Sequence, residues 1–320
     1  MSAPFLSIVV PIHNESASIP ELFVELAASL QAWGRPYEVL AIDDGSVDDS
    51  FERLVAIQAV DARVRVVRFR RNFGQTAAFA AGFALARGQV VVTCDGDLQN
   101  DPRDIPALVE VLEQGADIAC GWRLDRKDRF LSRRIPSRVA SWIISRVTGV
   151  TLHDYGCSLK AFRSDVVKPL RLYGGMHRLI PAIASERGAT IVERVVNHRP
   201  RRFGRSKYGL GRIVPVVLDL LTIKFFLSYS GRPIRVFGAI GLASGAIGLA
   251  VLGWLAWLAA AGGQPPGGRG TVLLVGVMLV LAGVQFVAVG LLAEMQARTY
   301  YESQDKPTYA IREIREHLAE

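Results

Sequence analysis

Two long stretches without a single charged residue constrain the fold of this chain more than any other feature. They cover residues 236–261 and 271–293, which are 26 and 23 residues long. As helices with a rise of about 1.5 Å per residue, they would reach roughly 39 and 35 Å, which exceeds the ~30 Å hydrocarbon core of a bilayer. A short glycine- and proline-rich segment separates them. The sequence therefore predicts a two-span transmembrane hairpin over 236–293, and the lack of ionisable residues within it favours an anchor over a transport pathway.

Basic residues flank this hairpin unequally. The turn carries only Arg269, whereas six basic residues lie within 20 residues of the outer ends, namely Lys224, Arg232, Arg235, Arg298, Lys306 and Arg312. Because positive charge favours the cytoplasmic side, we expect both flanks and both termini in the cytoplasm. The N-terminus lacks the basic region of a secretory signal, and three scattered cysteines exclude a disulfide framework. These patterns predict a multi-pass protein of the inner (cytoplasmic) membrane with the large N-terminal part of the chain in the cytoplasm.

Short β-rich runs alternate with amphipathic stretches through the first 200 residues. The strands expected from this pattern are 5–12, 37–42, 64–69, 89–94 and 117–121, and the helices are 18–33, 48–60, 73–87 and 104–114. A repeated strand–helix order is typical of an α/β fold with a mainly parallel sheet and helices on both faces. Ligands of such sheets bind beyond the carboxyl ends of the strands.

Polar side chains follow four of the expected strands at that end. They are Asn14 and Glu15, Asp43 and Asp44, Asp95 and Asp97, and Arg123. One acidic pair after a strand is usually a turn or a helix cap, but four clusters at one edge favour a binding site. The site contains neither the GxxxxGK[ST] loop of nucleoside triphosphatases nor the GxGxxG pattern of dinucleotide-binding proteins.

The segment CDGDLQND (94–101) has the composition of a site for a hard divalent cation. Asp95 and Asp97 are two residues apart in a turn opened by Gly96, and Gln99 follows. Mg²⁺ is commonly held by one or two carboxylates together with the phosphates of a substrate. The sequence therefore predicts Mg²⁺ or Mn²⁺ bound jointly by these side chains and a diphosphate.

A series of motifs gives this chain a resemblance to a known family. PIHNE (11–15), DDGS (43–46), NFGQTAAFAAG (72–82), DGDLQNDP (95–102), GWR (121–123), DYGCSLKAFR (154–163) and RFGRSKYG (202–209) occur in that order. They resemble the family 2 glycosyltransferases of the GT-A fold. With two C-terminal spans, the chain is most similar to polyprenyl-phosphate glycosyltransferases, which include dolichyl-phosphate mannose synthase and bactoprenol glucosyltransferase.

The resemblance implies a role for each matching residue. Donor-binding residues would be Pro11, His13 and Glu15 around the nucleoside, Ile42 and Asp44 at the base and ribose, and Asp95 with Gly96 at the nucleotide. Asp95, Asp97 and Gln99 would be the metal ligands, and Asp97 and Asp154 the catalytic residues. Asp154 would orient either the sugar or a basic neighbour, and a helix cap is its alternative role.

Two basic segments point to an anionic acceptor. Residues 121–138 contain seven Lys or Arg, and residues 198–212 contain six without any acid, within a chain of net charge +8. Nucleic acid is disfavoured because these segments adjoin a membrane anchor and lack interleaved aromatic residues. An alternative is that these segments form a solvated face or contact anionic lipid headgroups and bind no substrate. The phosphate- and acceptor-binding residues implied by the family are Arg123, Arg201 and Lys207, with Arg133, Arg134 and Arg178 as weaker candidates.

These expectations define a domain plan and a reaction. The plan has a GT-A domain over 1–210, an interfacial or juxtamembrane helix over 211–235, the hairpin, and a cytoplasmic tail over 294–320; residues 135–150 are a second interfacial candidate.

The reaction that the resemblance implies is inverting transfer of one sugar from a nucleotide sugar, with UDP-glucose favoured, to undecaprenyl phosphate. GDP-mannose-dependent mannose transfer is an alternative, and a non-catalytic nucleotide-binding scaffold is another. A processive synthase is disfavoured because QxxRW is absent. The resemblance also implies a homotetramer.

Overall fold

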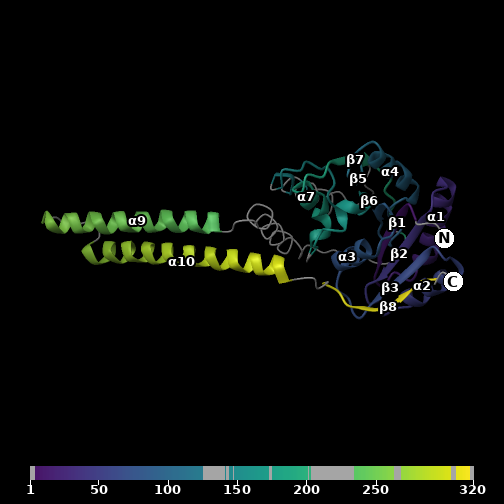
Figure 1. The fold of residues 1–320 in the computed structure, drawn as a ribbon, viewed down its shortest axis with the longest axis horizontal. Coiled ribbons are helices and arrows are strands. Elements are labelled where there is room, and N and C mark those ends of the chain that lie inside the picture. Colours follow the sequence, from purple (N-terminus) through teal and green to yellow (C-terminus); the bar gives the residue numbers. More distant parts are fainter. Residues whose placement is uncertain are drawn as a thin grey trace. The chain divides into compact units, whose positions relative to one another are not determined.

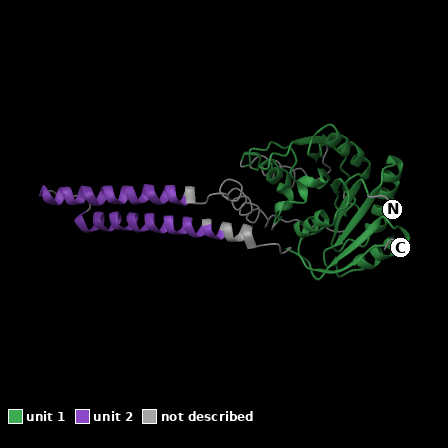
Figure 2. Ribbon diagram, viewed as in Figure 1, with its two compact units in different colours: residues 1–221, 307–320 green, residues 222–306 purple. Residues whose placement is uncertain are grey.

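A computed structural model describes residues 4–124, 141, 144–146, 148–172, 175–200, 202, 234–262, 268–303 and 308–317. The chain divides into two compact units, the first formed by residues 1–221 together with 307–320 and the second by residues 222–306 (Figure 2). The interfacial helices expected within 211–235 and 135–150 lie mostly or wholly outside the described residues. Each unit is described by itself below.

The described part of the first unit contains an eight-stranded mixed sheet (Figure 1). Its strands are β1 (Leu6–Ile12), β2 (Tyr37–Asp43), β3 (Val64–Phe69), β4 (Val90–Thr93), β5 (Ile118–Trp122), β6 (Lys160–Arg163), β7 (Ile191–Val195) and β8 (Ile311–Arg315). They lie in the order β7-β5-β6-β4-β1-β2-β3-β8. β1 pairs in parallel with β2 and β4, β2 with β3, and β5 with β7. β6 runs antiparallel to β4 and β5, and β8 antiparallel to β3.

Helices cover both faces of the central strands. The longer ones are α1 (Ile19–Trp33), α2 (Ser50–Val60), α3 (Gln75–Leu85) and α4 (Ile105–Glu113), and the short ones are α6 (Ser164–Val167) and α7 (Ile180–Ser185), with 3₁₀ turns η1 (Pro102–Asp104) and η3 (Met176–Leu179). Ile8 and Val10 of β1 pack in one buried cluster with residues of α1 and α4. The α/β architecture expected from the sequence is thereby confirmed.

A glycine brings α3 close to the central strand on the opposite face. A Cβ atom at Gly82 would lie 2.2 Å from Val9 Cγ1, so only glycine allows the helix to pack at this distance. The first residue of α3, Gln75, follows the left-handed Gly74 (φ 92°). This packing places the start of α3 at the carboxyl end of β1.

The C-terminal strand β8 joins the sheet through charged side chains as well as backbone pairing. Arg65 of β3 donates to Glu38 of β2 (2.9 Å) and to Glu316 just beyond β8 (2.7 Å). The side chains of Arg65 and Glu38 are each 7% exposed, and Glu38 also accepts from Ser7 Oγ (2.6 Å) and from Arg87 N (2.7 Å). Residues 294–320 were expected to form a cytoplasmic tail, but residues 311–315 of that segment form a strand of the sheet.

The second unit is a pair of long apolar helices, α9 (Ile234–Ala260) and α10 (Arg269–Ser303). Within them, Phe237–Ala260 and Arg269–Ala293 are long and apolar enough to cross a membrane. The helices pack closely through glycines, because a Cβ atom at Gly241 would lie 2.6 Å from the carbonyl oxygen of Gly283. Many of their large apolar side chains are exposed, as expected for surfaces that contact lipid.

We predict that removing the buried charge of Arg65 destabilises the first unit strongly. Arg65→Met leaves Glu38 buried without a cation, so the free energy of unfolding should fall by about 3–5 kcal/mol. Arg63→Met is the matched control, because Arg63 pairs with Asp61 at a more exposed position (side chains 30% and 21% exposed) and should cost less than about 1 kcal/mol. Chemical denaturation of the full chain in detergent measures both. Equal losses in the two variants would contradict the assignment.

Candidate functional site

The loop after β4 carries the two aspartates expected to bind a metal. Its conformation is restricted at Gly96, where a Cβ atom would lie 2.5 Å from Ile12 Cδ1 of β1. Ser18 Oγ donates to the Gly96 carbonyl oxygen (2.7 Å), and Leu98 adopts a left-handed conformation (φ 62°). Left-handed backbone at a non-glycine residue is uncommon and often marks a functional turn. The loop is therefore built tightly against the end of the central strand.

Asp95 and Asp97 form a concentration of negative charge on this loop. Gln75 Nε2 donates to Asp95 Oδ1 (2.7 Å), and the backbone N–H of Gln99 donates to Asp97 Oδ1 (3.2 Å). Burial and then the charge of Asp97 raise the pKa of Asp95 to about 6, although Arg123 and Lys160 act in the opposite direction. The raised pKa of Asp95 thus has burial as its first cause and a neighbouring carboxylate as its second.

This donor set fits a divalent cation that a ligand helps to hold. Carboxylate oxygens from Asp95 and Asp97, with the amide of Gln99 two residues on, suit Mg²⁺ or Mn²⁺. Within the described residues, no group of three or more His, Cys, Asp or Glu side chains is placed to hold a metal unaided. A diphosphate supplying the remaining oxygens is consistent with both observations.

The segment after β7, which contains His198 and Arg199, contacts Gln99. Gln99 Nε2 lies 3.4 Å from His198 Nε2 and 3.4 Å from the carbonyl oxygen of Arg199. Arg199 also pairs with Asp101 (2.8 Å). His198 is buried, and the sequence analysis missed it because a single histidine in a basic segment carries no distinctive pattern.

The expected nucleoside residues lie on the loops after β1 and β2. His13 Nδ1 lies 2.9 Å from the Asp44 carbonyl oxygen, and the Glu15 N–H donates to Ser50 Oγ (3.0 Å). Asn14, between them, is left-handed (φ 52°), and Pro11 is partly buried at the end of β1. These contacts join the first two polar clusters, as the parallel pairing of β1 and β2 requires.

Asp44 holds another loop in place. Its two carboxylate oxygens accept the backbone N–H groups of Phe73 (2.6 Å) and Gly74 (2.9 Å), and burial raises its pKa. Ile42 is fully buried in β2. A direct contact of Ile42 or Asp44 with a base or ribose stays a prediction, whereas the structure gives Asp44 the role of fixing the turn before α3.

Arg123 and Asp154 form a buried ion pair with two hydrogen bonds. Arg123 Nε donates to Asp154 Oδ2 (2.7 Å) and Nη2 to Oδ1 (2.9 Å), and their side chains are 13% and 4% exposed. The Gly156 N–H also donates to Asp154 Oδ1 (3.1 Å). Of the roles expected for Asp154, the geometry favours orientation of a basic neighbour. This bidentate pair fixes the direction of the guanidinium.

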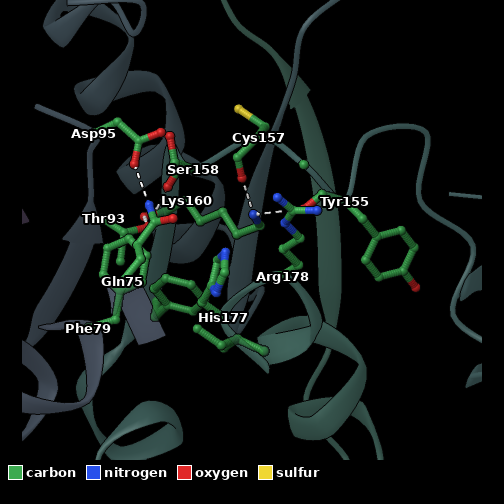
Figure 3. Close-up of a pocket in the computed structure, with 13 residues that line it drawn as sticks. Gln75, Phe79, Thr93, Asp95, Tyr155, Cys157, Ser158, Lys160, His177 and Arg178 are labelled. Atoms are coloured by element: carbon green, nitrogen blue, oxygen red, sulfur yellow. Dashed lines mark hydrogen bonds between the residues drawn. The ribbon is translucent and has the colours of Figure 1, made fainter. Parts of the chain in front are cut away.

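A small cavity of about 50 Å³ lies beside Asp95 (Figure 3). It is lined by Gln75 and Phe79 of α3, Thr93 and Asp95, residues 155–158, Lys160 and Phe162 of β6, and His177, Arg178 and Ile180. Thr76 Oγ1 lies 2.8 Å from His177 Nδ1. The structure therefore brings Arg178, a weaker candidate in the sequence, to the same cavity as Asp95.

Lys160 and Gln75 are lining residues that the sequence analysis did not select. Lys160 lies in the motif DYGCSLKAFR and Gln75 in the motif NFGQTAAFAAG. Their place in these family-like motifs could have identified them, whereas the charge pattern of the sequence could not. Arg133, Arg134, Arg201 and Lys207 lie outside the described residues, and their roles stay predictions.

Comparison with known proteins yields matches over most of the chain. Residues 7–171 match the profile of glycosyl transferase family 2. Dodecaprenyl-phosphate galacturonate synthase of Rhizobium johnstonii is 45% identical over 319 residues, covering 97% of this chain and 92% of the relative. Undecaprenyl-phosphate 4-deoxy-4-formamido-L-arabinose transferase of Edwardsiella ictaluri is 36% identical over 311 residues, covering 97% and 94%.

A solved structure supports the same fold. Glucosyl-3-phosphoglycerate synthase from Mycobacterium tuberculosis, in complex with Mn²⁺, uridine diphosphate and phosphoglyceric acid, superposes with a TM-score of 0.56. It is 21% identical and covers 72% of this chain and 81% of that chain. At this identity the likeness concerns the fold alone.

We predict a pH-dependent contribution of Asp101 to stability. Burial opposes its ionisation, but hydrogen bonds from Arg103 and Arg199 outweigh this and lower its pKa to about 2. Asp101→Asn should therefore reduce the free energy of unfolding by roughly 1–3 kcal/mol at pH 7. The ionised carboxylate stabilises the fold above pH ~4, the ordinary Asp value, so the difference from the parent chain should shrink as pH falls from about 4 towards 2.

Denaturant unfolding of the full chain at several pH values measures this effect. Glu113→Gln is the control, because Glu113 forms an exposed pair with Arg35 and should have a small effect at every pH. A deficit for Asp101→Asn that stays constant down to pH 3 and below would contradict the role given to the two arginines.

Proposed function

Because the chain belongs to glycosyl transferase family 2, we propose that it moves a single sugar from a nucleotide sugar to a polyprenyl phosphate at a membrane surface. The observation that carries this proposal is the acidic loop with Asp95 and Asp97, of which Asp95 lines a cavity together with Lys160 and Arg178, in a chain that also contains two membrane-length helices. Two full-length relatives are named for transfer of galacturonate and of formamido-arabinose to such lipids. Glycosyltransferase activity follows from the family; the acceptor and the sugar are the proposed parts.

The donor diphosphate would be bound at the loop after β4. Asp95, Asp97 and Gln99 would hold Mg²⁺ or Mn²⁺, which when bound neutralises the negative charge of the departing nucleoside diphosphate. Structural neighbours have been crystallised with uridine diphosphate and either metal, which supports this use of the site. The loop's fixed geometry costs little reorganisation during the reaction.

The acceptor phosphate would be the nucleophile. A lipid monophosphate is ionised near pH 7, so its oxygen attacks the anomeric carbon without a strong general base. The new bond joins that carbon to the phosphate oxygen as the bond to the nucleoside diphosphate breaks, and attack from the opposite face inverts the carbon. Arg123, oriented by Asp154, would position an anionic substrate, so catalysis rests on placement and charge stabilisation.

The identity of the sugar is decided by a donor panel. UDP-glucose is the donor favoured from the sequence and GDP-mannose the alternative, while the names of the relatives add galacturonate and formamido-arabinose donors. The whole proposal is tested by incubating the purified protein with undecaprenyl phosphate and each nucleotide sugar, with and without EDTA, and measuring the lipid-linked product. A non-catalytic scaffold remains the second candidate, and metal-dependent lipid product from any donor would reject it.

We predict that Asp97→Asn abolishes transfer. The substitution keeps the shape of the side chain but removes one of the two carboxylates beside the diphosphate, so kcat should fall by at least about a hundredfold. Asp61→Asn is the control, because Asp61 lies on the turn after α2 and pairs with Arg63. Transfer to undecaprenyl phosphate is measured at saturating metal. Unchanged turnover of Asp97→Asn would refute the assigned metal role.

We also predict that the turn of the hairpin faces outward and the chain after it faces the cytoplasm. All three native cysteines are buried, so single cysteines at exposed positions report topology without background. A membrane-impermeant maleimide should label Gly270→Cys in intact cells, and Thr308→Cys only after the membrane is opened. Labelling of Thr308→Cys in intact cells would reverse the orientation.

The resemblance also implies a homotetramer. Cross-linking or mass measurement in detergent tests this proposal directly.

A further inference from the structure

Lys160 is a buried ammonium group whose direct hydrogen-bond partners in the described part of the chain are neutral. It lies on β6 and is 3% exposed. Its Nζ donates to the backbone carbonyl oxygens of Tyr155 (3.4 Å) and Cys157. No carboxylate of the described residues forms an ion pair with it. A lysine ammonium has three N–H donors, so two carbonyl acceptors leave one donor unused, and its charge acts on Asp95 without a direct ion pair.

The surroundings of Lys160 make this arrangement costly unless a ligand completes it. Burying an unpaired charge is unfavourable by several kcal/mol, and Arg178 brings a second cation to the same cavity wall (Figure 3). Asp95 is the one carboxylate among the described lining residues, and it accepts from Gln75 Nε2 at 2.7 Å. The cavity is therefore suited to an anion that arrives with a substrate.

The position of the cavity indicates which anion this is. Asp95 lines this cavity, whereas Asp97 and Gln99 do not. Under the proposed function Asp97 and Gln99 bind the donor diphosphate, so the cavity would receive the sugar. A volume of about 50 Å³ suits a carboxylate group. A neutral hexose would place hydroxyl groups there and leave two cations, Lys160 and Arg178, facing Asp95 as the one carboxylate of the described lining.

We propose that Lys160, together with Arg178, binds the carboxylate of the transferred sugar, so that the donor is a nucleotide-linked uronic acid. This inference rests on the proposed function, because it assigns the sugar within the same site. A site built to bind a charged group discriminates against an analogue that lacks the group, since its own buried polar atoms are then unpaired. Lys160 is thus a specificity-determining residue.

The test compares acidic and neutral donors of the same stereochemistry. UDP-galacturonate is measured against UDP-galactose, and UDP-glucuronate against UDP-glucose, each with undecaprenyl phosphate. For the epimer that is used, kcat/KM of the acidic donor should exceed that of its neutral counterpart at least about tenfold. Lys160→Met should bring this ratio close to one, while Lys160→Arg, which keeps the cation, should preserve it.

Arg163→Met is the matched control. Arg163 is on the same strand, but its side chain is 45% exposed and points to Asp117 and not to the cavity, so its loss should leave the donor ratio unchanged. If Lys160→Met does not fold, Arg178→Gln removes the second cation of the wall and should reduce the ratio in the same direction.

Donor binding without lipid separates the possible sources of the anion. Calorimetry with the UDP-sugars alone should show tighter binding of the uronate to the parent chain and a selective loss in Lys160→Met. If Lys160→Met instead raises KM for undecaprenyl phosphate equally with both donors, the lysine binds the lipid phosphate and the inference is overturned. Equal use of acidic and neutral donors by the parent chain overturns it as well, with the proposed function intact. Selective uronate binding without any transfer to lipid would leave this inference standing and reject the proposed function.

Discussion

The parallel pairing of β1 with β2 and β4 is the constraint on which the site depends. It brings the carboxyl ends of three strands to one edge of the sheet, so loops distant in the sequence lie in contact. His13 then reaches the Asp44 backbone, Asp44 fixes the turn before α3, and Gln75 at the start of α3 reaches Asp95. The loops are therefore held by one another as well as by the core.

Much of the fold could be predicted from the sequence because the central elements are long and strongly patterned. The runs 5–12, 37–42 and 64–69 agree with β1, β2 and β3 within a residue, since each is rich in β-branched or other apolar residues. The strands β6, β7 and β8 were not predicted. β6 is only four residues long, and β7 and β8 are rich in charge. Their strand conformation depends on partner strands distant in the chain, and the hydrophobic periodicity of the sequence does not reveal such partners.

The candidate site shows the same division. Asp95, Asp97 and Gln99 were selected from the sequence because they are close together and have the ligand chemistry of hard cations, and their metal role stays a prediction. Lys160 and His198 were not selected, because they come close to Asp95 and Gln99 only when β6 and the segment after β7 are brought near the loop after β4. Asp154 was left with alternative roles, and its bidentate contact with Arg123 favours one of them.

The return of the chain to the sheet at β8 makes the membrane hairpin an insertion within the first unit rather than an appendage to it. Cutting the chain ahead of α9 to obtain a soluble enzyme would also delete the edge strand β8 and remove the ion pair between Arg65 and Glu316. β3 would then present an unpaired edge, which invites aggregation. A soluble version is better sought by replacing the hairpin with a linker and retaining residues 308–317.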